Sequence, residues 1–242
     1  MKAVILAAGM GKRLVSAGWE EPKCLLRFGD RTLMDNILSA LAAVDVRDII
    51  IVVGYKHELV RAGVMGHNAR VKFVVNEDYA ETNTINSLYL AREHLNDDFL
   101  YFNADVLFDC RILPLLLGQD DSTLAIDVGA CGTEEVKVIA DGEGRILRIG
   151  KQLPVDECQG EFIGIAKFAA SVCEDFVASL VRYNEQLGRR NLFFESAVDP
   201  LLAAHVHRSV PIGELSAVEI DSPEDLAAAR QLWQTGRMQT VR

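Results

Sequence analysis

The fold of this chain is decided by its opening stretch, Lys2-Ala3-Val4-Ile5-Leu6-Ala7-Ala8-Gly9-Met10-Gly11-Lys12-Arg13-Leu14. The first residues form an apolar run that predicts a buried strand rather than a signal peptide, because the apolar part is too short. Small residues and glycines then let the backbone approach a ligand, and consecutive N–H groups in such a turn form an anion-binding concavity. Lys12 and Arg13 add two donors suited to a polyphosphate. We therefore predict a strand followed by a phosphate-binding loop.

Two better-known phosphate loops do not fit this stretch. A P-loop needs Ser or Thr after its Gly-Lys pair, whereas Gly11-Lys12 is followed by Arg13. A dinucleotide-binding loop needs a third glycine where Leu14 stands, and an acidic residue at the end of the second strand, where the chain has Gly54. The remaining alternative is a flexible connection whose two cations are simply solvated.

Short β-branched runs alternate with amphipathic stretches in the first part of the chain. The successive segments cover residues 2–6, 33–44, 48–53, 71–75, 85–95 and 99–102. This alternation is typical of strand-helix-strand units, and a strand such as 48–53 is apolar on both faces, as expected between two layers of helices. We therefore predict an α/β fold with a mostly parallel central sheet flanked by helices.

The pattern changes from about residue 130. Residues 135–140 and 145–149 surround the turn Asp141-Gly142-Glu143-Gly144, which predicts a β-hairpin. A strand at 162–166, helices at 172–187 and 195–204, a strand at 218–220 and a last helix follow. Because no repeat, low-complexity tract or linker interrupts the chain, we expect a single domain over residues 1–242, with 130–170 as a hairpin and strand excursion.

Composition argues against several classes of protein. A hydrophobic fraction of 50% in 242 residues suffices for a sizeable core. No run reaches the roughly 18 apolar residues of a membrane helix. The net charge of -10 disfavours a nucleic-acid partner, since such binding relies on clustered Lys and Arg. Five scattered cysteines suggest neither a disulfide framework nor a zinc site. We expect a cytoplasmic protein with neither a membrane nor a nucleic-acid partner.

Three carboxylates mark a second candidate site. Asp105 follows the apolar strand at 99–102, at the carboxyl edge where open parallel sheets bind ligands, although a turn after a strand is the alternative. Glu219 and Asp221 are two residues apart, so in a strand their side chains point the same way. Asp221 is not needed as a helix N-cap, because Ser222 can cap the last helix with Asp225 completing a capping box. Mg²⁺ prefers such oxygen ligands, so these three carboxylates predict a magnesium site.

The opening loop and three further motifs resemble the nucleotidyltransferases that activate sugar 1-phosphates and phospho-alcohols. The further motifs are Glu21-Pro22-Lys23, Asn103-Ala104-Asp105 and Glu219-Ile220-Asp221-Ser222-Pro223-Glu224-Asp225-Leu226. In that superfamily the loop wraps the triphosphate, the Pro-Lys element supplies a further cation and the acidic residues hold the metal. The resemblance implies catalytic roles for Lys12, Arg13 and Lys23, and a Mg²⁺ ion on Asp105, Glu219 and Asp221. Taken alone, Lys23 would be an ordinary surface lysine.

Four later stretches carry a narrower resemblance. They are residues 81–91, 149–151, 160–168 and 191–196. Together, over nearly the whole chain, they are similar to the short cytidylyltransferases that act on phosphocholine, phosphonates and inositol phosphate. The resemblance implies a Rossmann-like nucleotidyltransferase fold with a mixed, mostly parallel sheet. It also implies an enzyme that couples CMP from CTP to a small phosphate or phosphonate acceptor and releases pyrophosphate.

The same resemblance assigns further residues to the nucleotide. Those residues are Leu6, Ala7, Ala8, Gly9, Gly11, Asn83, Thr84, Ser87 and Asp105. Asn83, Thr84 and Ser87 stand where a loop enters a helix, a natural position for polar contacts to a ligand. Plain helix capping is the alternative for each of these three.

Two more residues are expected in an acceptor site to which the excursion at 130–170 contributes. The resemblance implies that Lys151 faces the acceptor's phosphate, against the alternative of a solvated hairpin lysine. Glu195 would neutralise a cationic head group, although the neighbouring Phe193 and Phe194 are typical of a core.

The chain departs from the phosphocholine pattern in ways that favour a smaller or more polar acceptor. Aromatic rings enclose a quaternary ammonium, but only 7% of these residues are aromatic. Residues 128–133 are small and non-aromatic, and Val218 stands where phosphocholine-type sequences often have Trp. We expect an aminoalkylphosphonate, another phosphonate or a phospho-alcohol. The alternatives are a sugar-1-phosphate nucleotidyltransferase, a glycosyltransferase of related fold and a non-catalytic nucleotide-binding protein.

Overall fold

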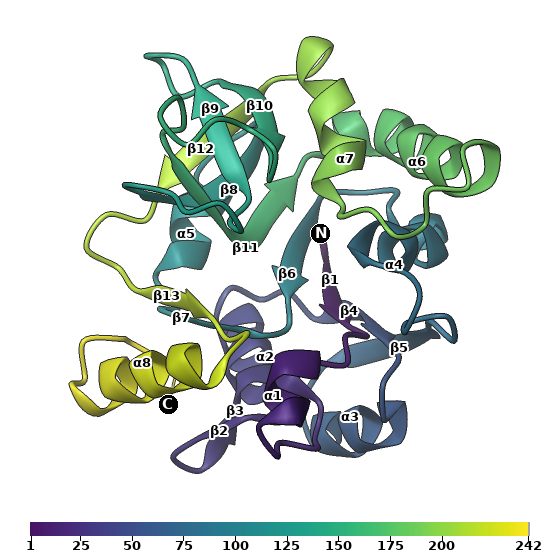
Figure 1. Cartoon of the computed structure of the whole chain (residues 1–242). Coiled ribbons are helices and arrows are strands. Elements are labelled where there is room, and N and C mark those ends of the chain that lie inside the picture. The colour runs from purple at the N-terminus through teal and green to yellow at the C-terminus, as the bar shows by residue number, and fades with distance from the viewer. Residues whose placement is uncertain (242) are drawn as a thin grey trace.

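A nine-stranded sheet forms the centre of the molecule (Figure 1). The computed structural model describes residues 1–241. The strands of this sheet are β1 (Lys2–Ala7), β4 (Asp48–Val53), β5 (Arg70–Val75), β6 (Phe99–Asn103), β8 (Ser122–Val128), β9 (Lys137–Ala140), β10 (Ile146–Gly150), β11 (Gly160–Phe168) and β12 (His207–Pro211). Their order is β10-β9-β11-β6-β1-β4-β5, with β8 paired to β11 and β12 paired to β8. Strands β6, β1, β4 and β5 are parallel and β11 is antiparallel to β6, which confirms the predicted mixed, mostly parallel central sheet.

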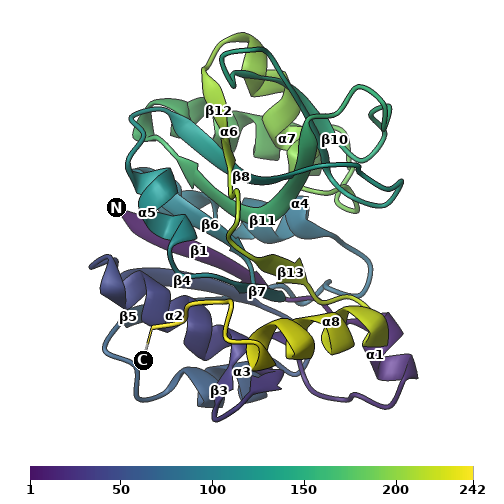
Figure 2. The ribbon, with the colours of Figure 1, turned by 90° about the vertical axis from the view of Figure 1, so that its left-hand side faces the viewer.

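Helices cover both faces of the parallel strands (Figure 2). They are α2 (Leu33–Ala43), α3 (His57–Val64) and α5 (Ile112–Leu117) on one face, and α4 (Thr84–Leu90), α6 (Cys173–Val181) and α7 (Glu195–Val198) on the other. Along β1, Ala3, Ile5 and Ala7 pack with the first group, while Val4 and Leu6 pack with the second. Because successive side chains of a strand point to opposite faces, two helical layers bury every residue of such a run.

The hairpin predicted around residue 141 is confirmed. β9 and β10 pair antiparallel, and the Asp141 carboxylate accepts hydrogen bonds from the backbone N–H groups of Glu143 and Arg145 inside the turn. β11 is longer than the predicted strand: β8 pairs with both of its ends, while on its other edge β9 pairs with its first residues and β6 with its last. This long strand therefore connects the hairpin to the central sheet.

Two helices end earlier than the apolar patterns of the sequence predict. The helix predicted over 85–95 ends at Leu90, and the one predicted over 195–204 ends at Val198. In the second case Pro200 has no N–H for an α-helical hydrogen bond, so the chain continues as a 3₁₀ turn. The short turns are the 3₁₀ turns Lys23–Leu25, Arg92–His94, Ala170–Val172 and Asp199–Ala203, and the π-helical turn Arg182–Gln186.

A smaller group of elements lies beside the sheet and carries the last helix. It contains α1 (Lys12–Ser16), β2 (Arg27–Phe28), β3 (Arg31–Thr32), β7 (Val106–Phe108), β13 (Ala217–Glu219) and α8 (Pro223–Gln234). β2 pairs with β3, and β7 pairs antiparallel with β13. α8 packs its apolar side against Leu14 and Phe28. The centroid of the Trp233 ring in this helix lies 5.9 Å from the centroid of the Phe28 ring. The predicted capping box is confirmed, because Ser222 and Asp225 exchange side-chain to backbone hydrogen bonds at the start of α8.

Within residues 1–241, none of the helices has both the length and the apolar surface that crossing a membrane requires.

Candidate active site

A cleft of about 350 Å³ opens at the carboxyl ends of β1 and β6. Most of the predicted site residues line it: Leu6, Ala8, Gly9, Arg13, Asn83, Thr84, Ser87, Asp105, Lys151, Glu195, Glu219 and Asp221. Ala7, Gly11 and Lys23 line a smaller recess that shares Leu6, Gly9 and Asp105 with the cleft. Lys12 is exposed at the start of α1, and within the described chain its side chain makes no hydrogen bond or ion pair. The fold therefore gathers residues from both ends of the sequence and leaves Lys12 outside.

The loop after β1 has a shape that depends on two glycines. Gly11 has a φ of 65°, and a Cβ there would come within 2.9 Å of the Lys23 Cε. The Ala8 carbonyl accepts a hydrogen bond from the Tyr55 N–H at 3.1 Å, and a Cβ on Gly54 would lie 2.8 Å from that oxygen. Gly54 therefore lets the loop approach the end of β4, which is a packing reason for a glycine at this position.

Three carboxylates from two distant segments converge beside this loop. β7 starts directly after Asp105, and its pairing with β13 places Glu219 opposite Val106. The Ile220 N–H donates a hydrogen bond to the Asp105 carbonyl at 3.0 Å. As a result, Asp105, Glu219 and Asp221 each offer an oxygen atom, and these atoms lie within 4.8 Å of one another. That spacing suits a single ion with oxygen ligands.

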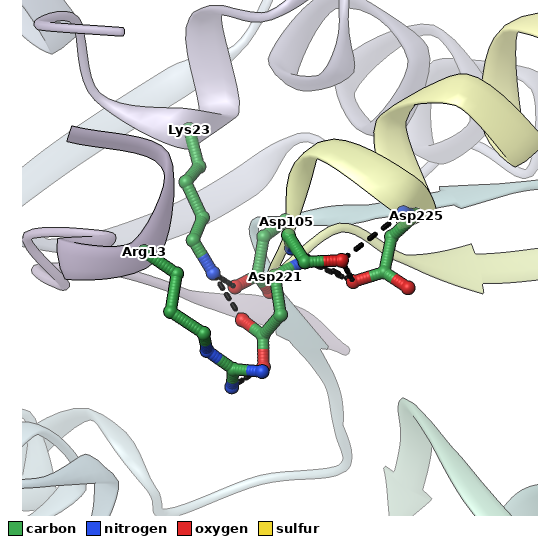
Figure 3. A network of polar contacts seen from close by, with 6 residues as sticks. Arg13, Lys23, Asp105, Asp221 and Asp225 are labelled. Carbon is green, nitrogen blue, oxygen red and sulfur yellow. Dashed lines mark hydrogen bonds and ion pairs between the residues drawn. The ribbon is translucent and has the colours of Figure 1, made fainter. Parts of the chain in front are cut away.

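The capping box of α8 also fixes the backbone of Asp221 (Figure 3). The Asp225 Oδ2 accepts hydrogen bonds from the Asp221 N–H at 3.0 Å, the Ser222 N–H at 2.8 Å and the Ser222 hydroxyl at 2.8 Å. Because Asp225 satisfies the start of the helix, the Asp221 side chain is free to face the cleft.

Two cations pair with these carboxylates (Figure 3). The Lys23 Nζ donates to Asp105 Oδ2 at 3.1 Å and to Asp221 Oδ1, and Arg13 donates to Asp221 Oδ2 at 2.7 Å. Burial by itself lowers the pKa of Lys23, but the charges of Asp105 and Asp221 outweigh it and raise the pKa overall. Burial likewise raises the pKa of Asp221, but the charges and hydrogen bonds of Lys23, followed by Arg13, lower it overall. Lys23 is therefore charged and Asp221 ionised at neutral pH.

The cluster is suited to a divalent cation. Burial, followed by the charges of Asp105 and Asp221, raises the pKa of Glu219 to about 8. The Glu219 side chain also has an exposed face at the rim of the cleft, so solvent moderates this shift, but crowding of three carboxylates explains its direction. The cations Lys23 and Arg13 pair with Asp105 and Asp221, and neither pairs with Glu219, so two positive charges face three carboxylates. An all-oxygen set with excess negative charge matches the preference of Mg²⁺ and similar hard cations.

A buried amide network forms another part of the wall of the cleft. Asn76, which follows β5, donates from Nδ2 to the Thr82 Oγ1 at 3.1 Å and to the Ser87 Oγ at 3.3 Å. Its Oδ1 accepts from the Asn86 Nδ2 at 3.2 Å. Asn76, Thr82 and Ser87 all line the cleft. Sequence reasoning missed Asn76, because an Asn after a strand is usually a turn residue and only its burial distinguishes it.

Asn83 and Thr84 make structural contacts in addition to lining the cleft. The Asn83 Oδ1 caps α4 by accepting from the Thr84 N–H at 2.8 Å, as the capping alternative predicts. The Thr84 Oγ1 accepts from the Phe194 N–H at 2.8 Å. Arg190, a residue that sequence reasoning also missed, donates to the Asn86 Oδ1 at 3.1 Å. These contacts fasten residues 190–194 to the amide network.

Lys151, Phe193 and Glu195 form a further part of the lining of the cleft. The Lys151 Nζ lies 4.1 Å from the centroid of the Phe193 ring. Phe193 is 38% exposed, whereas Phe194 is buried with its ring 4.4 Å from that of Tyr101, so only Phe194 has the predicted core position. Glu195 is 4% exposed, and burial raises its pKa to about 7 despite the charge of Lys151 nearby. The protein alone therefore does not keep this carboxylate fully ionised at neutral pH.

Known proteins resemble this chain in sequence and in fold. Residues 3–136 match the MobA-like NTP transferase domain. The chain is 32% identical to CMP-5'-(3-aminopropyl)phosphonate synthase of Streptomyces rubellomurinus, over 93% of this chain and 37% of that protein. It is 24% identical to CTP:phosphoglutamine cytidylyltransferase of Campylobacter jejuni, over 80% of this chain and 81% of that protein. The solved structure of CTP:phosphocholine cytidylyltransferase from Streptococcus pneumoniae matches with a TM-score of 0.79 at 25% identity, covering 96% of this chain and 98% of that one.

The α/β fold with its glycine-lined loop and acidic cluster at one sheet edge defines a nucleotidyltransferase. Within that class, the chain belongs to the family of MobA-like NTP transferase domains, whose match spans more than half of its residues. The resemblance to short cytidylyltransferases and the Rossmann-like nucleotidyltransferase fold are thereby confirmed.

Proposed function

We propose that the chain transfers CMP from CTP to a small phosphate or phosphonate acceptor and releases pyrophosphate in the cytoplasm. The observation that carries this proposal is the convergence of Asp105, Glu219 and Asp221 beside the glycine-lined loop, where the cations Arg13 and Lys23 pair with two of these carboxylates. The names of the relatives in Streptomyces and Campylobacter support CTP as the nucleotide. A glycosyltransferase would release no pyrophosphate, and a non-catalytic binding protein would not need this combination of cations and carboxylates.

The proposed reaction is an in-line displacement at phosphorus. An oxygen of the acceptor's phosphate or phosphonate forms a bond to the α-phosphorus of CTP, and the bond from that phosphorus to pyrophosphate breaks. Both reactants are anions, so the residues contribute mainly by positioning and by offsetting charge. Arg13 and Lys151 line the cleft and Lys23 lines the recess beside it, and Lys12 belongs to the proposed set as a cation for the outer phosphates because it precedes Arg13. No covalent intermediate on the protein is needed.

Asp105, Glu219 and Asp221 are the residues that would hold Mg²⁺. When bound, a divalent cation neutralises charge on the phosphates of the nucleotide. Lys23 pairs with Asp105 and Asp221, while its stem packs along Gly11 of the loop. We propose that its ammonium leaves these carboxylate partners and binds a phosphate oxygen when the nucleotide enters, because the flexible Lys23 side chain lies directly beside the loop.

The acceptor in this proposal carries a primary ammonium group. A buried Glu195 gains a hydrogen-bonding cation if the acceptor has an amine, whereas a quaternary ammonium has no N–H to donate. In addition, Lys151 covers a face of the Phe193 ring that a quaternary ammonium would otherwise use. The aminopropylphosphonate in the name of the Streptomyces relative supports an acceptor of this kind. Lys151 is then the cation for the acceptor's phosphonate or phosphate.

The test is a matrix of the four ribonucleoside triphosphates against 2-aminoethylphosphonate, phosphocholine, inositol phosphate and glucose 1-phosphate, with release of pyrophosphate as the readout. We expect activity with CTP and 2-aminoethylphosphonate, lost with a chelator and restored by excess Mg²⁺. A preference for phosphocholine would refute the primary ammonium. A preference for glucose 1-phosphate would favour the sugar-1-phosphate alternative over the proposed function.

A further inference from the structure

Lys137 is a buried lysine whose ammonium is surrounded by backbone carbonyl groups. It is the first residue of β9 and is only 1% exposed. Its Nζ donates to the carbonyl oxygens of Gly132, Thr133 and Glu135, each at 3.2 Å, and to that of Lys151 at 2.6 Å. The protein therefore provides four acceptors for the three N–H bonds of this ammonium, in place of water.

This ammonium joins two segments that lie on the acceptor end of the cleft. Residues 132–135 form an irregular loop before β9, and Lys151 follows the last residue of β10. Glu134 from the first segment, Val136 directly after it and Lys151 from the second segment line the cleft. Lys137 is not among the lining residues, so it lies behind this wall and holds its two parts together.

Removing the ammonium would leave these carbonyl groups without their donor. Buried acceptors that lose a hydrogen-bond partner are costly, and a loop relieves that cost by moving toward water. In this case the movement would displace the loop carrying Glu134 and the backbone of Lys151. The side chain of Lys151 would then lose its position over Phe193, at the place proposed for the acceptor's phosphonate.

We propose that Lys137 is a positioning residue for acceptor binding. It acts through the loop at 132–135 and through the backbone of Lys151, and it touches neither substrate. The inference rests on the proposed function in one respect, namely that this end of the cleft takes the acceptor while the loop after β1 takes the nucleotide.

Lys167 offers a matched control in the same sheet. It lies in β11, is 5% exposed, and its ammonium donates to the backbone carbonyl of Gln119. In the part of the chain that the structure describes, neither Lys167 nor Gln119 lines the cleft. Lys167→Met therefore removes a buried ammonium from the sheet without disturbing the acceptor end.

The test compares the steady-state kinetics of Lys137→Met and Lys167→Met with CTP and 2-aminoethylphosphonate. We expect Lys137→Met to raise the acceptor KM about tenfold while the KM for CTP changes by less than about twofold. Lys167→Met should lower the melting temperature and leave both KM values unchanged. Equal changes in the two KM values of Lys137→Met, or an unchanged acceptor KM, would overturn the proposal. Should the Met variant not fold, Lys137→Gln replaces it. The glutamine side chain is one bond shorter than that of lysine but keeps two N–H donors, so the acceptor KM should rise by less than the roughly tenfold expected for Lys137→Met.

Amide hydrogen exchange provides a readout that does not depend on activity. Exchange at residues 132–136 and just after Gly150 should be faster in Lys137→Met than in the wild-type protein, and unchanged in Lys167→Met. Unchanged exchange in Lys137→Met would contradict the positioning role. If the wild-type protein transfers CMP to none of the tested acceptors, the proposed function fails, while faster exchange in the variant still supports Lys137 as the clamp of this wall.

Discussion

The two walls of the cleft are built in different ways. The wall that we propose for the nucleotide, here called the nucleotide wall, comprises residues 8–13, 76–87 and 105 and directly follows the ends of the parallel strands β1, β5 and β6. The wall that we propose for the acceptor, here called the acceptor wall, comprises residues 132–136, 151 and 193–195. It consists mainly of irregular segments before β9, after β10 and at the start of α7, and the first two are joined by the Lys137 side chain. The family match over residues 3–136 includes all of the first wall but only the loop of the second. We infer that the shared chemistry belongs to the sheet edge, and that selectivity belongs to segments that can vary without disturbing it.

This division has a measurable consequence. A substitution in the nucleotide wall or its carboxylate cluster should lower turnover with every acceptor, because all acceptors need the same displacement at phosphorus. A substitution in the acceptor wall should change the KM for one class of acceptor and leave the nucleotide KM unchanged.

Asp105→Ala should have the largest effect. It removes a carboxylate from the proposed metal site and a partner of Lys23, so kcat should fall by roughly 10³-fold or more with every acceptor. Steady-state release of pyrophosphate measures kcat, and the melting temperature establishes that the variant folds. Asp120→Ala, an exposed aspartate, is the control and should retain wild-type turnover. Near-normal turnover in folded Asp105→Ala would rule out the metal site.

Lys23→Met should lower kcat by about 10²-fold with all acceptors, because it removes a buried cation next to both the loop and the carboxylates. Lys12→Met should lower kcat by only about tenfold, since that side chain is exposed and lies outside the cleft. Comparing kcat of the two variants under identical conditions measures the difference. A larger effect from Lys12 would mean that the loop rearranges around the nucleotide.

Glu195→Gln should affect the acceptor wall alone. The KM for 2-aminoethylphosphonate should rise about tenfold, and that for ethylphosphonate, which lacks the amine, should stay within about twofold. Burial raises the pKa of Glu195 to about 7, so the carboxylate that binds an ammonium forms only as pH rises through that value. The KM of the amine acceptor should therefore fall between pH 6 and pH 8 in the wild type by more than in Glu195→Gln, which has no proton to lose. Parallel pH profiles in the two proteins would contradict this role.

The two capping boxes give the smallest expected effect and the closest comparison. Thr32→Ala and Ser222→Ala each remove an N-cap hydroxyl, at α2 and α8, so each should lower the free energy of unfolding by about 1 kcal/mol. Only Ser222→Ala should also lower kcat, by about twofold to threefold, because the Ser222 and Asp225 pair holds the backbone of Asp221. Denaturant unfolding and kcat of the two variants check both statements. Equal kcat values in Thr32→Ala and Ser222→Ala would mean that the α8 cap does not influence the active site.

Features that depend on neighbours in the chain could be predicted from the sequence. The opening strand and loop, the hairpin turn at Asp141 and the capping box at Ser222 are each encoded within a few residues. The same holds for Asp105, Glu219 and Asp221 as candidates, since each stands at a strand end or in a recognisable motif. Strands β7 and β8 were not predicted, because short apolar runs have no periodicity that separates them from loops or helices.

By itself, the sequence determined the alternation of strands and helices, the glycine-rich loop after the first strand and the candidate carboxylates at strand ends, because these follow from local conformational preferences and apolar spacing. Only the tertiary structure decided that β7 pairs with β13, which brings Glu219 and Asp221 to Asp105 from more than a hundred residues away. It alone also decided that Asn76, Arg190 and Lys137 support the walls of the cleft. The reason is physical. What a buried polar group contributes to stability or to a site depends on its hydrogen-bond partners, and those partners are defined only once distant segments have packed.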